Sequence, residues 1–84
     1  MEQETSFCLL ALSLCNATLV GLGLIHEPES GKMKKNLPVA KENIDLLLML
    51  QQKTKGNLTQ EESELLEGLL YDLRLKYVEA SKIQ

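Results

Sequence analysis

The stretch from Phe7 to Ile25 reads FCLLALSLCNATLVGLGLI and contains no charged residue. Leucine and alanine dominate it, and both are strong helix formers, so we expect a helix over about residues 5–25. A helix that is apolar nearly all round must be buried, either in protein or in lipid. How this segment is covered therefore decides how the rest of the chain is arranged.

Three small residues, Ser13, Ala17 and Gly21, recur every four positions within this segment. Residues four apart lie on one face of a helix, and small side chains there let a second helix approach closely. Asn16 lies in the same segment, and a single buried asparagine can fix the register between paired helices. We therefore expect Asn16 to be a buried polar residue at a helix–helix interface.

A turn and a second helix follow the apolar segment. The residues Glu27 to Gly31 (EPESG) have the composition of a tight turn, because Pro presets one dihedral angle and Gly tolerates positive φ. The second helix is expected over about residues 37–55. Asn36 is a suitable N-cap for it, Pro38 is tolerated in its first turn, and Gly56 suits its C-terminal stop.

The clearest local signature is the capping box Thr59-Gln60-Glu61-Glu62. In this motif the Thr59 side chain accepts from the N–H of Glu62, while the Glu62 carboxylate accepts from the N–H of Thr59. A third helix is therefore expected over about residues 60–82. Its inner face is predicted from helical spacing to comprise Leu66, Leu69, Leu70, Leu73 and Tyr77.

Length and composition place these helices in one small domain. The 84 residues are 44% apolar but only 4% aromatic, and leucine supplies most of the apolar content. Such a composition favours helix over strand. We predict an all-α fold, a single helical domain over residues 1–84, in which three helices form a bundle.

The apolar surface exceeds what three helices can hide among themselves. The first helix and the middle of the second have no polar face, and large exposed apolar patches are unusual on soluble monomers. We therefore expect self-association to complete the bundle, as a two-fold homodimer or a homotetramer. The predicted oligomer interface comprises Leu10, Ser13, Leu14, Ala17, Gly21, Leu47 and Leu50.

A membrane offers the alternative cover. The run from Phe7 to Ile25 is close to the roughly 20 residues that span a bilayer core. In this alternative it anchors a single-pass or interfacial membrane protein at the inner membrane, and the later helices are cytoplasmic. Its polar residues and the absence of tryptophan anchors disfavour that alternative, and the acidic start lacks the positive charge of a signal peptide. We expect a cytoplasmic protein.

Chemistry is not indicated by any constellation in the chain. A net charge of −3 argues against nucleic-acid binding, although Lys32, Lys34 and Lys35 form a short basic stretch. Cys8 and Cys15 lie about 10 Å apart along a helix, too far for a disulfide, and the lone His26 leaves too few ligands for a metal. We expect no catalytic residues, no metal and no cofactor.

Several runs of residues resemble one family. They are Asn36 to Lys41 (NLPVAK), Ile44 to Leu47 (IDLL), Lys53 to Thr59 (KTKGNLT) and Leu70 to Arg74 (LYDLR). The chain resembles the small bacterial family of unknown function DUF1844 along nearly its whole length. The resemblance implies a short, helical, cytoplasmic bacterial protein, and it carries over no catalytic or binding residues.

The sequence thus predicts a non-enzymatic, oligomeric helical scaffold or adaptor. Its partner is a second copy of itself, and a further protein partner is expected at the exposed loops or the terminal helix.

Overall fold

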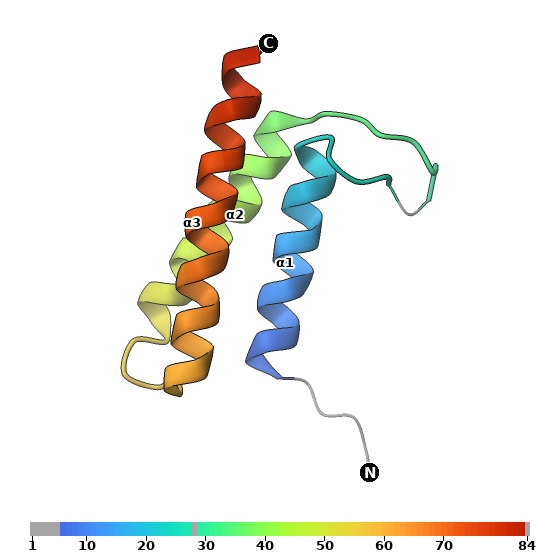
Figure 1. Cartoon of the computed structure of the whole chain (residues 1–84). Coiled ribbons are helices and arrows are strands. Elements are labelled where there is room, and N and C mark those ends of the chain that lie inside the picture. Colours follow the sequence, from blue (N-terminus) through green and yellow to red (C-terminus); the bar gives the residue numbers. More distant parts are fainter. Residues whose placement is uncertain (1–5, 28, 84) are drawn as a thin grey trace.

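The computed structural model describes residues 6–27 and 29–83, and these residues form a three-helix arrangement without strands (Figure 1). The helices are α1 (Phe7–Gly21), α2 (Leu37–Lys53) and α3 (Gln60–Ile83). The three helices pack on one another in a compact bundle. The predicted all-α fold is therefore confirmed.

Helix α1 is shorter than the expected span of about residues 5–25. It begins after Ser6, whose side chain accepts a hydrogen bond from the N–H of Leu9 at 3.0 Å, while Thr5 lies outside the described residues. At its other end the N–H of Leu24 donates to the Leu19 carbonyl, and the N–H of Gly23 donates to the Val20 carbonyl. This is a Schellman motif, which needs a residue with positive φ, and Gly23 supplies it at +78°.

The connector between α1 and α2 is held at both ends. Its turn is closed by hydrogen bonds from the N–H of Gly31 to the Glu27 carbonyl and from the N–H of Glu27 to the Lys32 carbonyl, both 2.8 Å. Asn36 ends the connector: its N–H donates to the Gly21 carbonyl at 2.7 Å, and its side chain caps α2 by accepting from Val39. The start of α2 is thereby fixed to the end of α1, so the two helices run antiparallel (Figure 1).

Helix α3 begins with the predicted capping box. The N–H of Glu62 donates to Thr59 Oγ1 at 3.1 Å, and the N–H of Thr59 donates to Glu62 Oε1 at 2.9 Å. Glu61 and Glu62 also place negative charge at the positive end of the helix dipole. These local interactions start α3 at the position where the chain turns back along α2.

The core lies where the three helices meet. Its buried residues are Ala11 from α1, Ile44 and Leu47 from α2, and Leu66, Leu70 and Leu73 from α3. Leu47 and Leu66 are completely buried. Leu69 and Tyr77 pack against this cluster from its edge, so the predicted inner face of α3 does face the core.

Candidate functional site

Helix α3 covers one side of the layer that α1 and α2 form. Asp72 and Lys76 on α3 lie close enough to Cys15 on α1 for their charges to act on the pKa of its thiol. On α2, Ile44 and Leu48 share a surface depression with Arg74 and Tyr77 of α3. A helix turns through about 100° per residue, so residues on the opposite sides of α1 and α2 point away from α3.

The opposite side of this layer is an uncharged surface, which we call the open face. Helical spacing assigns to it Leu10, Ser13, Ala17 and Val20 of α1 with Val39, Asn43, Leu46 and Leu50 of α2. Leu10, Val39 and Leu46 are 42%, 40% and 37% exposed, and the others range from half-buried to exposed. Charged residues, Glu42 and Lys53, occur only along its α2 edge. The chain itself thus leaves one face of its α1–α2 layer uncharged, largely apolar and uncovered.

The residues predicted for the oligomer interface divide into two groups. Leu10, Ser13, Ala17 and Leu50 lie on the open face. Gly21, Leu14 and Leu47 instead hold the monomer together: Leu47 is completely buried, Leu14 packs against the core, and Gly21 is buried against Ala40. Because a 15-residue α1 already buries one side against its own chain, these three residues have their contacts within the monomer, and their place at an oligomer interface stays a prediction.

Asn16 is not buried by its own chain, so its expected burial at a helix–helix interface stays a prediction. It is exposed on α1, and the buried polar residue of this helix is Thr18, which is fully buried. The Thr18 hydroxyl donates to the Leu14 carbonyl at 2.8 Å, so it meets its hydrogen-bonding need within the helix. The Thr hydroxyl can donate to the carbonyl four residues earlier in the helix. The Asn amide carries both an acceptor and a donor group, so it needs an additional partner when it is buried.

Sequence reasoning missed Val20, Val39 and Leu46 as open-face residues. The signal was present on α2, where Val39, Leu46 and Leu50 follow helical spacing. The apolar surface of α2 is so broad that this spacing does not stand out, because core residues and open-face residues both occur between Ile44 and Leu50. Only the position of α3 separates the two sets.

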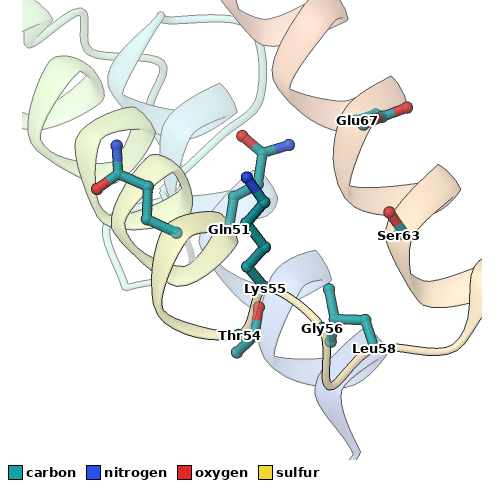
Figure 2. A pocket seen from close by; sticks show the side chains of 8 residues that line it. Gln51, Thr54, Lys55, Gly56, Leu58, Ser63 and Glu67 are labelled. Atoms are coloured by element: carbon teal, nitrogen blue, oxygen red, sulfur yellow. The ribbon is translucent and has the colours of Figure 1, made fainter.

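A second candidate is a polar depression at the turn between α2 and α3, which we call the loop pocket (Figure 2). Its volume is about 320 Å³, and it is lined by Gln51, Gln52, Thr54, Lys55, Gly56, Leu58, Ser63 and Glu67. The Lys55 side chain runs back alongside Gln51, while Ser63 and Glu67 lie across on α3 (Figure 2). Leu58 closes the turn by packing against the core.

The loop pocket has no arrangement for covalent or acid–base catalysis. The only ionisable side chains that line it are Lys55 and Glu67, and nucleophilic catalysis needs a nucleophile, a base and an orienting group within hydrogen-bonding distance. The Thr54 hydroxyl is already engaged, since it donates to the Leu50 carbonyl at 2.6 Å. The residues of the turn, from Thr54 to Thr59, end α2 and start α3.

The two cysteines are free thiols on α1. Burial raises the pKa of the Cys15 thiol, and the nearby Asp72 carboxylate raises it further, while Lys76 acts in the opposite direction. A raised pKa keeps the thiol protonated, which makes it a weak nucleophile and a weak metal ligand. Among the residues that the structure describes, no three His, Cys, Asp or Glu side chains gather where they could hold a metal ion.

The outer side of α3 carries a separate apolar strip. Tyr71 is 71% exposed, and Leu75 and Val78 are about half exposed. Together with Arg74 they line a shallow groove of about 220 Å³. This surface, which we call the α3 strip, lies away from the open face.

No helix within residues 6–27 and 29–83 has both the length and the apolarity to cross a membrane. At 15 residues, α1 is about 22 Å long, whereas a bilayer core is about 30 Å thick.

The fold and its surfaces define a small three-helix protein with an uncharged α1–α2 face. The chain belongs to the family described as Domain of unknown function (DUF1844), whose family model matches residues 4–79. This confirms the resemblance seen in the sequence. No curated protein and no solved structure shows a significant match to the chain.

Proposed function

We propose that this protein is a non-enzymatic, self-associating helical module that acts as a scaffold or adaptor in the bacterial cytoplasm. The observation that carries the proposal is the open face. Large apolar patches on soluble proteins mark interaction surfaces, and this one lacks charged residues along the whole of α1.

A protein interface would need only part of the surface of this chain. A stable interface buries roughly 800 Å² of each partner, a modest share of the 6037 Å² surface of this chain. Helix α1 supplies a strip about 22 Å long, and the flank of α2 widens it. The centre of a good interface is depleted of charge, as the open face is.

The adaptor part of the proposal rests on the α3 strip. Exposed Tyr and Arg side chains are frequent among the residues that dominate binding energy, and Tyr71 and Arg74 lie together beside Leu75. A dimer built through the open face leaves this strip accessible in both copies. Each assembly then offers two equal docking surfaces for a further protein.

The test is the molar mass of the whole chain in detergent-free buffer, measured by size-exclusion chromatography with light scattering. We expect a sharp peak at a multiple of the 9.4 kDa chain mass. A control variant on the α3 strip, Tyr71→Glu, should leave this mass unchanged. A folded monomer, or protein recovered only with membranes, would contradict the proposal.

A further inference from the structure

The open face has internal symmetry that points to one arrangement of two copies. We propose that two chains pack their open faces together about a two-fold axis, with the two α1 helices antiparallel and Ser13 of each opposite Ala17 of the other. This inference rests on the proposed self-association and goes beyond it by naming the orientation and register.

The first argument is the order of large and small residues along α1. The open-face residues of this helix are Leu10, Ser13, Ala17 and Val20, so two small residues lie between two large ones. In an antiparallel pair centred between Ser13 and Ala17, Leu10 faces Val20 of the other copy. The small central pair lets the helix axes approach closely, and the larger residues close both ends of the interface.

The second argument is that α2 has its midpoint at the same level. Gly21 lies against Ala40, since a Cβ at Gly21 would be 3.0 Å from the Ala40 nitrogen. Because α1 and α2 are antiparallel and rise equally per residue, the point midway between Ser13 and Ala17 is level with Leu46. The axis that relates the α1 helices thus also brings Leu46 opposite its own counterpart.

The third argument is charge. Glu42 and Lys53 border the open face on α2, both are exposed, and neither forms an ion pair within the described part of its own chain. In the antiparallel arrangement Lys53 of one copy lies about 4.5 Å along the axis from Glu42 of the other. An axial offset of this size is short compared with the length of a lysine side chain.

Disulfide trapping tests the arrangement in a chain carrying Cys8→Ser and Cys15→Ser. Leu46→Cys alone should give a covalent dimer, because this residue faces its own counterpart. Leu10→Cys together with Val20→Cys should also give one. Leu10→Cys alone should not, since the two copies of residue 10 would lie about 15 Å apart along the axis, beyond disulfide reach. Leu12→Cys, 47% exposed but off the open face, measures random cross-linking.

The outcomes separate this inference from the proposed function. Covalent dimer from Leu46→Cys and from the Leu10/Val20 pair, at least tenfold above Leu12→Cys, supports the arrangement. A dimeric mass combined with efficient cross-linking of Leu10→Cys alone would overturn the orientation while leaving self-association intact. A monomeric mass for the uncross-linked chain would overturn both. Circular dichroism of each variant confirms that the helices are retained.

Discussion

At the scale of single residues, two glycines in helices have opposite surroundings. Gly21 is buried, and a Cβ there would lie 3.0 Å from the backbone nitrogen of Ala40 and 3.2 Å from its Cα. Backbone cannot move aside as a flexible side chain can. Gly68 has nothing within 4 Å of the same position, so no other part of the described chain approaches it.

Substitution by alanine should therefore have opposite effects at these two positions. Gly21→Ala should lower the free energy of unfolding by about 1–3 kcal/mol through overpacking. Gly68→Ala should raise it by up to about 1 kcal/mol, since Ala favours a helix more than Gly. Urea unfolding followed by circular dichroism measures both. Equal effects of the same sign would contradict the close approach of α1 to α2.

The Cys15 thiol gives a prediction about pH. Because burial and then Asp72 raise its pKa, its alkylation by iodoacetamide should require a higher pH than alkylation of cysteine in a short peptide. In a Cys8→Ser background, Asp72→Asn should move the pH profile of the rate to lower pH and accelerate the reaction about twofold, the size of an exposed charge interaction. A profile that Asp72→Asn leaves unchanged would show that this carboxylate does not act on Cys15.

The same pKa has a consequence for stability. A thiol whose pKa is higher in the folded chain contributes stability below its unfolded value and loses that contribution as the pH rises through its folded value. The effect belongs to alkaline solution. It does not alter stability near neutral pH, where the thiol is protonated in both states.

At the scale of elements, the start of α3 depends on its capping box. Thr59 and Glu62 exchange two hydrogen bonds of 3.1 and 2.9 Å, which satisfy two N–H groups that the helix cannot. Thr59→Ala should lower the free energy of unfolding by about 1 kcal/mol. Thr59→Ser should retain most of the stability, because Ser is also a good N-cap.

A double-mutant cycle with Glu62→Ala tests whether these two side chains act together. We expect the Thr59→Ala, Glu62→Ala double variant to lose less stability than the two single losses added, by about 0.5 kcal/mol or more. Chemical denaturation of the four proteins provides the measurement. Strict additivity would mean that the two side chains stabilise α3 independently.

Local signals in the sequence were sufficient for most element boundaries. Asn36 and Thr59 are strong N-caps, and each starts a helix where the sequence predicts it. The apolar run continues past Gly23 and predicts an end near Ile25, whereas α1 ends at Gly21. Gly23, which forms the Schellman motif, is a helix-stopping residue in the sequence. The apolar residues after it favoured a longer helix.

The division between core and open face was less predictable than the helices. On α2 both Leu46 and Leu47 are leucines in one apolar run, yet Leu47 is completely buried and Leu46 is 37% exposed. Periodicity identifies the two sides of α2 but not which side α3 covers. That assignment depends on the packing of all three helices, which the periodicity of α2 alone does not supply.

At the scale of the whole molecule, core and open face should respond differently to substitution. Leu47→Ala should lower the free energy of unfolding by about 3–5 kcal/mol, because it leaves a cavity where three helices meet. Leu47→Asp should unfold the chain, since it buries a charge without a partner. Circular dichroism should show lost helix in Leu47→Asp. A folded, helical monomer from that variant would contradict the core described here.

The central claim, that the open face joins copies of the chain, is tested most directly by sedimentation equilibrium of the unmodified chain beside Leu46→Glu. The account predicts a mass twice the 9.4 kDa chain for the former, and a helical monomer for the latter, because a carboxylate facing its own counterpart repels it. An unmodified chain that sediments as a monomer at all concentrations, or a Leu46→Glu variant that retains the dimeric mass, would contradict it.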